Sequence, residues 1–422
     1  MKKRIALILT AVLGASCMLT GCGGGSGNKE SAETAKKEDK GTETISLLSW
    51  YNEDILGEFI DGFEKENPGI EVDLQYVPPT QQYVDKFSVL ASSGQMTDMF
   101  FTAAENNQEV RDKGLAEDIS DLPIFERIDE KVSSTYSDGD KIYAYAPDAW
   151  VGGIFYNKAL FEQAGISGEP KTWDDMVDAM TKLKDAGIEP YLDSQENVYN
   201  LPLNLYFDMV ISKDREADAK INKGEAKFAD FYTEPMDLWY KDMVETGLYS
   251  QISLGLSSDQ VLDMFVTGQV AMMHGGPWNV QTIESKNPDM EYDIFPLPDN
   301  DGNVVFSGAV NVGMSISSST EKKESCKKFL EYMSEDENIL KWQKCTGNAI
   351  VVQGIEYEMN SVFDKFKQEA VDGNFYWPPC VWNNSAGILK ELVAASQDAV
   401  TGADTAENVA ARLDTKMEEL SE

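Results

Sequence analysis

Residues 264–280 read MFVTGQVAMMHGGPWNV, and this stretch decides how we interpret the fold. Its first residues predict the end of a helix, which Gly268 stops ahead of a short apolar strand at 270–273. The Gly-Gly-Pro that follows at 275–277 predicts a turn that presents Trp278. A flat ring on such a turn suits the edge of a ligand cleft better than a core, because a rigid aromatic face can cover a flat apolar surface. The alternative is that Trp278 simply caps a lobe.

The chain begins with the layout of a secretory signal. Basic residues at 2–4 precede an apolar run at 5–13 that is too short to span a membrane, and Leu-Thr-Gly-Cys follows at 19–22. That tetrapeptide resembles a bacterial lipobox. We therefore expect residues 1–21 to be a signal peptide, Cys22 to carry lipid, and the Gly-rich polar stretch 22–42 to be a flexible tether at the outer face of the cell membrane. The alternative is an ordinary signal peptide in which Cys22 is incidental.

Composition excludes several classes of function. The formal net charge is -37, which repels the phosphates of nucleic acids and favours solubility outside the cell. The only histidine is His274, which argues against the usual zinc sites and against Ser-His or Cys-His catalysis, so we expect no metal and no cofactor. About 380 residues remain after the leader and tether, which is more than one core usually supports, so two lobes are expected.

Three cysteines follow Cys22. Cys326 lies on the apolar stripe of a predicted helix with Phe329, Leu330 and Met333, which predicts a buried free thiol. The spacing of Cys345 and Cys380 permits a disulfide and does not require one.

Strand and helix patterns alternate along the first part of the chain. They predict a strand at 44–50, a helix from Asn52, a strand at 70–76, a helix around 83–90 and a strand at 97–101. This order implies a parallel sheet. Because ligands of open parallel sheets bind beyond the carboxyl ends of the strands, a site is expected around 50–54 and 101–106.

The remaining patterns predict a second lobe and several crossings between the lobes. A crossing is expected at Pro147, a helix from Asn157, and a further helix at Thr172 with Asp175 in the capping-box position. Residues 299–303 predict a hairpin turn, because they lack the terminal glutamate of a calcium loop. The chain should return to the first lobe along 306–317, leave it near 349, and finish in one long helix at 388–420. These crossings imply a hinge made of several strands. Lobe 1 would be formed by 43–148 and about 308–346, and lobe 2 by 149–307 and about 347–422.

Several motifs together resemble those of a known family. They are GIFYNK at 153–158, AGI at 164–166, PKTWDD at 170–175, FVTGQVAM at 265–272 and GPW at 276–278. In this order they are similar to the extracellular solute-binding proteins of ABC transporters, specifically the sugar-binding group that includes maltodextrin-binding proteins. The resemblance implies an α/β, two-lobed periplasmic-binding-protein fold of type II, with a sugar in the cleft and a membrane permease as partner.

The resemblance also suggests positions in the site. It places polar groups of the loop Trp50 to Asp54 on sugar hydroxyls, Asp98 near the cleft, and Trp278 against a sugar ring. Trp150 stands about where the maltodextrin relatives have a carboxylate, which argues against maltose itself. Residues 375–377 and 382–384 fall roughly where relatives contribute another aromatic ring.

The chemistry of a pyranose agrees with this reading, because it offers an apolar C–H face and an edge of hydroxyl groups. The candidate rings are Trp50, Trp150, Trp278, Trp377 and Trp382, and the candidate polar groups are Asn52, Glu53, Asp54, Asp98, Glu105, Asp148 and Asn279. Not all of them can line one cleft. Core or surface packing is the alternative for each tryptophan other than Trp278, and ordering of a strand end is the alternative for Asp98.

The main hypothesis is a non-catalytic, monomeric, lipid-anchored receptor that closes on a carbohydrate and presents the closed form to an ABC permease. One alternative is a surface glycoside hydrolase, which needs only two suitably separated carboxylates. Another is the same fold with a peptide, polyamine or metal as ligand.

Overall fold

The computed structural model describes residues 42–78 and 81–421. The expected signal peptide, the lipidation site at Cys22 and the tether lie outside these residues. Within them, no helix combines the length and the apolar character needed to cross a membrane.

The first sheet has the strand order β11-β3-β1-β2. Strand β1 (Glu43–Ser49) pairs in parallel with β2 (Ile70–Tyr76) and with β3 (Met99–Thr102), whereas β11 (Gly313–Ile316) runs antiparallel to β3. The helices α1 (Glu53–Glu66) and α2 (Gln81–Ser93) connect the parallel strands. The predicted parallel sheet is therefore confirmed. We call the part of the chain built on this sheet the first lobe.

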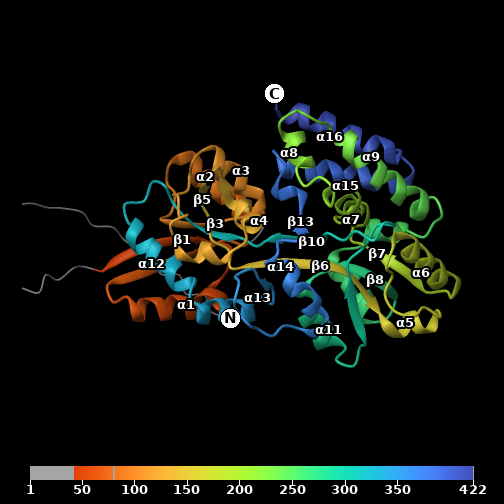
Figure 1. Ribbon diagram of the computed structural model, residues 1–422, viewed down its shortest axis with the longest axis horizontal. Helices are drawn as coiled ribbons and strands as arrows, with labels where there is room; N and C mark the ends of the chain where they lie inside the picture. The colour runs from red at the N-terminus through yellow and green to blue at the C-terminus, as the bar shows by residue number, and fades with distance from the viewer. Residues whose placement is uncertain (1–41, 79–80, 422) are drawn as a thin grey trace, which may run out of the picture. The chain divides into compact units, whose positions relative to one another are not determined.

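The second sheet has the strand order β13-β10-β6-β8-β7 and defines the second lobe. Its longest strand is β6 (Asp148–Asn157), which pairs with β10 (Phe306–Val310), β8 (Val270–Gly275), β9 (Tyr292–Phe295) and β12 (Ala349–Ile350). The outer strands are β13 (Phe375–Tyr376) and β7 (Glu189–Leu192). Figure 1 shows β6 and β10 extending beside each other through the middle of the view.

The helices of the second lobe follow the predicted caps. Asn157 caps α5 (Lys158–Gln163), and Thr172 with Asp175 forms the predicted capping box of α6 (Trp173–Asp185). The helices α7 (Asn200–Tyr206), α9 (Phe228–Trp239), α15 (Ser385–Thr401) and α16 (Ala406–Ser421) pack together in Figure 1. The remaining helices of this lobe are α8 (Ala217–Asn222), α10 (Ser258–Val266), α11 (Val280–Lys286) and α14 (Lys367–Val371).

In the first lobe, α3 (Ala104–Asp112) follows β3, and the short α4 (Glu130–Ser133) precedes the hairpin of β4 (Ser137–Asp138) and β5 (Lys141–Ile142). Helices α12 (Lys323–Met333) and α13 (Asp336–Thr346) follow β11. Cys326 is buried and free, as predicted, and Cys345 and Cys380 are also unpaired.

Two predictions of local structure are wrong. Residues 299–303 do not close a hairpin, because β9 and β10 pair with successive stretches of β6 and not with each other. Asp299 instead orders the loop by accepting hydrogen bonds from the backbone of Asp301 and Asn303 at 2.9 Å each. The C-terminal helix is two helices, because Gly402 takes a left-handed conformation (φ 73°) that ends α15.

The chain passes between the two sheets three times: at Pro147 into β6, at Asn311 between β10 and β11, and at Gly347 between α13 and β12. Apolar packing follows a different division. One buried cluster includes the first sheet together with Phe155, Phe265 and Phe363, whereas a second cluster lies wholly within the second lobe.

Candidate ligand-binding cleft

Four aromatic side chains of the second lobe form a continuous group that we call the aromatic wall: Trp150, Trp278, Trp377 and Tyr199. The ring of Trp150 on β6 packs edge-on against Trp278 (5.6 Å between centroids) and Trp377 (5.5 Å), and Trp377 also contacts Tyr199 at 6.1 Å. Trp278 remains 54% exposed. The wall therefore has aromatic surface that is exposed to solvent and is not packed in the core.

The turn after β8 explains how Trp278 reaches the wall. A Cβ atom on Gly276 would lie 2.3 Å from the indole ring of Trp278, so only glycine lets the ring fold back over its own turn. Asn279 fixes the turn, since its Oδ1 accepts the N–H of Gly276 at 3.0 Å. Asn279 therefore acts on the geometry of the turn that carries Trp278.

A cavity of about 410 Å³ continues from the wall at Trp377 and is lined from both lobes. Its floor is Gly308, Ala309 and Val310 of β10, next to Trp150 in the sheet, because Ala309 is the register partner of Trp150. The first lobe contributes residues of α3 and of the segment 131–137, and the second lobe contributes residues of α8 and of the turn after β13. The cavity thus lies where two lobes could clasp a ligand.

Cationic side chains are prominent in this cavity. Arg111 and Lys131 line it from the first lobe and Arg215 from the second, whereas Glu216 is the one carboxylate among the described residues that line it. Arg111 pairs with Asp112 at 3.0 Å, and no carboxylate of the described residues lies within ion-pair distance of Lys131 or Arg215. These cations were not predicted, although the scarcity of arginine in so acidic a chain was a usable signal.

Hydrogen bonds join the lobes beside the cavity. The backbone N–H of Asn384 donates to Oε1 of Gln108 on α3 at 2.7 Å, and Lys131 Nζ donates to the carbonyl of Asp372 at 3.3 Å. Asn384 is the one non-glycine among the described residues with a positive φ (55°). The backbone at this contact is held in an uncommon conformation that asparagine tolerates better than most residues.

Asp148 occupies the hinge. Its Oδ2 accepts hydrogen bonds from Asn311 (3.2 Å), Thr346 (3.1 Å) and Asn348 (2.9 Å), so it connects all three passages between the sheets. Its Oδ1 is buried and has no hydrogen-bond partner among the described residues. Burial raises the pKa of this carboxyl, against the lowering effect of Asn348 and Asn311.

The loop after β1 contacts both the hinge and a separate groove. Its Tyr51 accepts a hydrogen bond from Asn311 of the hinge at 3.0 Å. Trp50 packs edge-on against Tyr83 of the first lobe at 5.4 Å. Asn52 is the N-cap residue of α1, and together with Glu53 and Asp54 it lines a separate groove between α1 and β2.

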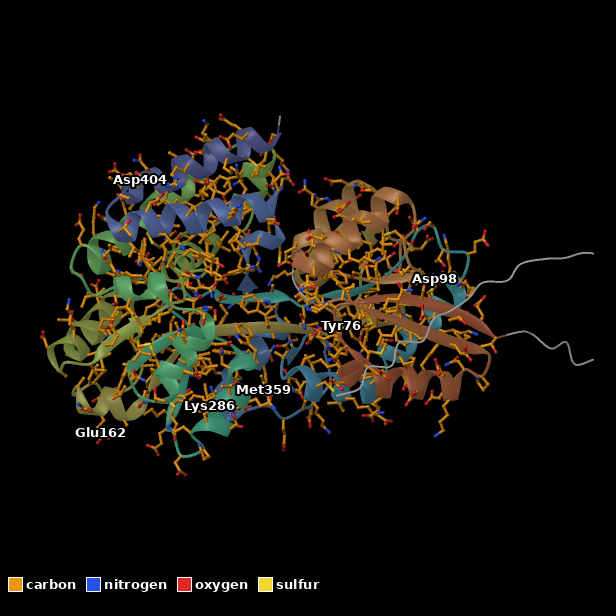
Figure 2. All side chains as sticks on the ribbon, turned by 180° about the vertical axis from the view of Figure 1, so that it is seen from behind. Tyr76, Asp98, Glu162, Lys286, Met359 and Asp404 are labelled. Atoms are coloured by element: carbon orange, nitrogen blue, oxygen red, sulfur yellow. The ribbon has the colours of Figure 1, made fainter. Side chains whose placement is uncertain are left out.

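Asp98 lies at the start of β3. It pairs with Lys322 at 3.0 Å and accepts hydrogen bonds from Ser46 and Thr320, which lower its pKa to about 2 although partial burial opposes this. Figure 2 shows Asp98 and Tyr76 at opposite ends of the first sheet. This placement matches the alternative that Asp98 orders a strand end.

Glu105 and Trp382 complete the predicted set. Glu105 lies in the first turn of α3, two residues before Asn107, which lines the cavity, and burial raises the pKa of Glu105. Glu105 is therefore close to the cavity. Trp382 is 2% exposed and its Nε1 donates to Asp218 at 3.0 Å in the core of the second lobe. Of the five predicted rings, the structure brings together Trp150, Trp278 and Trp377.

Comparisons with known proteins define the class to which this fold and cleft belong. Residues 44–340 match the model of the bacterial extracellular solute-binding protein family. The chain therefore belongs to that family. The described residues contain no group of three or more His, Cys, Asp or Glu arranged to hold a metal ion.

Individual relatives are more distant. The chain is 26% identical to the multiple sugar-binding protein of Streptococcus mutans over 402 residues, which is 90% of each chain. It is 22% identical to the galactooligosaccharide-binding protein of Bacillus subtilis over 355 residues, covering 80% of this chain and 77% of the relative. Among solved structures, a family 1 extracellular solute-binding protein from Bifidobacterium longum subsp. infantis has a TM-score of 0.79 and 28% identity, covering 90% of this chain and all of the other.

Proposed function

We propose that this protein captures an oligosaccharide outside the cell and delivers it to an ABC importer. The observation that carries the proposal is the aromatic wall at the mouth of a cavity lined from both lobes. Indole faces cover the C–H face of a pyranose, and the amides and hydroxyls of the cavity suit its hydroxyl edge. The sugar-binding names of the relatives support the same ligand class.

Among the predicted site residues, we assign ring stacking to Trp150, Trp278 and Trp377, and contacts near the cavity to Glu105. We assign indirect roles to Asn279, which holds the turn, and to Asp148, which connects the three hinge segments. Trp50, Asn52, Glu53 and Asp54 contact ligand only if a long saccharide extends along the first lobe.

The division of the chain remains a proposal as well. Lobe 1 would comprise 43–148 and about 308–346, and lobe 2 would comprise 149–307 and about 347–422. The membership of β11 in the first sheet and of β12 and β13 in the second supports it. Closure of these lobes is productive only if the ligand binds the closed form more tightly than the open form.

The test of the ligand class is isothermal titration calorimetry against a panel of neutral and acidic mono- and oligosaccharides, with melting temperature as a second readout. At least one saccharide should release heat and raise the melting temperature. The proposal is wrong if none does. Prolonged incubation with a bound oligosaccharide should release no new reducing ends, because we propose a receptor without catalytic activity.

We also propose that Cys22 anchors a monomeric protein to the outer face of the cell membrane. Metabolic labelling with an alkyne fatty acid should tag the native chain and not Cys22→Ala, while Cys345→Ala should be labelled normally. Labelling of Cys22→Ala would contradict the anchor. Light scattering on the purified chain should give the mass of one copy.

A further inference from the structure

The charge of the interlobe cavity is opposite to that of the chain. The whole sequence carries 73 acidic and 36 basic residues, and has a net charge of -37. In contrast, two arginines and a lysine line the cavity with a single carboxylate, Glu216. Among the described residues, the cavity is a local positive site in a negative protein, and that contrast calls for a physical reason.

Arg215 is held in a fixed position. One of its terminal nitrogens, Nη2, donates to the carbonyl oxygens of Gly373 (2.8 Å) and Phe375 (2.7 Å), and the guanidinium lies over the ring of Tyr376 at 5.7 Å. The other guanidinium nitrogens have no acceptor among the described residues. Burial lowers the pKa of Arg215, and the nearby charges of Tyr376 and Asp129 oppose this. A planar fork with unused donors, already held in place, is suited to binding a planar or tetrahedral oxyanion.

The two cations of the first lobe differ in how far they are neutralised. Arg111 has a partner in Asp112, but the pair is partly exposed, with side-chain exposures of 33% and 52%, so its attraction is weakened by solvent. Lys131 Nζ contacts the carbonyl of Asp372 and pairs with no described carboxylate. A ligand anion in the cavity would therefore meet cations from both lobes.

We propose that this cavity takes the anionic group of an acidic saccharide, one that bears a carboxylate or a sulfate, while the neutral rings of the same ligand stack on the aromatic wall. This inference rests on the proposed function and specifies its ligand class. A neutral sugar gains little from uncompensated guanidinium and ammonium groups. An acidic sugar is repelled by the net field of the chain unless cations compensate at the point of contact.

The cations would also make closure of the two lobes depend on the bound ligand. Arg111 and Lys131 belong to one lobe and Arg215 to the other, so a bridging anion contacts all three only when the lobes are together. Differential binding of this kind is what shifts a population toward the closed form.

The experiment is titration calorimetry of the full chain with trigalacturonate, a neutral galactose trisaccharide of the same length and a sulfated galactose oligosaccharide. An acidic ligand should bind at least tenfold more tightly than the neutral one, and its affinity should fall as salt rises. Arg111→Gln and Lys131→Gln should each weaken binding of the acidic ligand about tenfold, and by a larger factor than they weaken binding of the neutral trisaccharide. The control is Lys65→Gln, an exposed cation of the same lobe outside the cavity, which should change neither.

The outcomes separate the two proposals. Equal or tighter binding of the neutral trisaccharide, unaffected by Arg111→Gln and Lys131→Gln, overturns this inference and leaves the proposed function standing. Absence of binding by every saccharide overturns the proposed function itself. Arg215→Lys tests the second lobe without removing its charge, and should weaken binding of trigalacturonate more than Lys65→Gln does.

Discussion

Two groups of four aromatic side chains lie in the second lobe, and they differ in burial and in hydrogen bonding. In the aromatic wall, none of the three indole N–H groups donates to a described residue, and Trp278 is half-exposed. In the other group, Tyr206, Tyr232, Tyr376 and Trp382 are all buried around Asp218, which we call the Asp218 cluster. Tyr206 and Tyr232 stack there at 3.9 Å.

A single carboxylate accounts for the difference. Asp218 accepts hydrogen bonds from Tyr232 (2.9 Å), Tyr376 (2.8 Å) and Trp382 (3.0 Å), so these rings can be buried with their polar atoms satisfied. Tyr376 and Trp377 are neighbours in the chain, yet one joins each group. Three rings near the cleft thus serve folding because a buried acceptor collects their donors, whereas the three indoles of the wall have no such acceptor among the described residues.

The largest effect should come from removing that acceptor. Asp218→Ala leaves three buried donors without their common partner, and we expect a loss of roughly 3–5 kcal/mol in the free energy of unfolding. Denaturant titration measures it. Asp178→Ala on the exposed face of α6 is the control and should stay within about 0.5 kcal/mol of the parent. A loss below about 1 kcal/mol for Asp218→Ala would show that the cluster tolerates unpaired donors.

Asp193 is a second buried carboxylate of the second lobe. Asp193 accepts hydrogen bonds from Asn200 (2.9 Å) and Tyr249 (3.2 Å), and burial raises its pKa to about 7. Since the unfolded chain releases this proton near pH 4, the folded state binds more protons between these values. The free energy of unfolding of the parent should therefore fall relative to Asp193→Asn by on the order of 1.4 kcal/mol per pH unit from about pH 4 to pH 7, and stay level above that.

Denaturant titrations of both proteins across this range give the measurement. Parallel stability curves for parent and Asp193→Asn would mean that the carboxyl ionises in the folded protein as it does in the unfolded chain.

A substitution in the aromatic wall should change the affinity for saccharide and leave the stability of the fold nearly unchanged. Trp278→Ala should lose roughly 1–3 kcal/mol of saccharide binding, because the ring is partly desolvated only when ligand covers it. Its melting temperature should change little, since the side chain is 54% exposed. Tyr76→Ala is a matched control, being an aromatic residue 44% exposed on the first lobe. Unchanged affinity in a folded Trp278→Ala protein would assign that ring to packing.

The smallest effect should come from the contact between the lobes. Gln108→Ala removes the acceptor for the backbone N–H of Asn384, and one such hydrogen bond contributes about 0.5–1.5 kcal/mol. If the contact belongs to the closed form, saccharide affinity falls by a few-fold in calorimetry. Gln95→Ala on an exposed position of the first lobe should have no effect. Tighter binding by Gln108→Ala would show that the contact opposes ligand entry.

Most of the fold could be predicted from the sequence because its signals are local. Asn157 and Thr172 cap helices with their own side chains, Asn52 stands at the predicted N-cap position, and strand alternation predicts the strands of the parallel sheet. The hairpin predicted at 299–303 failed because the pairing of β9 and β10 with β6 is long-range and leaves no mark in the turn. The break at Gly402 was visible, but the apolar periodicity on both sides of it outweighed one glycine.

The site was less predictable because most of its contacts join segments that are distant in the sequence. The Gly-Gly-Pro turn identifies Trp278 locally, whereas the contacts of Trp150 with Trp278 and Trp377 join distant segments. Trp377 and Trp382 have similar surroundings in the sequence, and what separates them is a hydrogen bond to Asp218 on another helix. The cations of the cavity lie on elements that the fold, and not their sequence neighbours, brings together.

The buried apolar cluster that joins the first sheet to Phe155, Phe265 and Phe363 has a consequence for how the protein unfolds. Separating the lobes completely would expose this shared apolar surface, so melting of either lobe destabilises the other, although the second lobe also has a buried cluster of its own. Calorimetry should therefore show one transition whose measured enthalpy equals its van't Hoff enthalpy. The lobes can move as two bodies around the hinge, yet in thermal unfolding they behave as one.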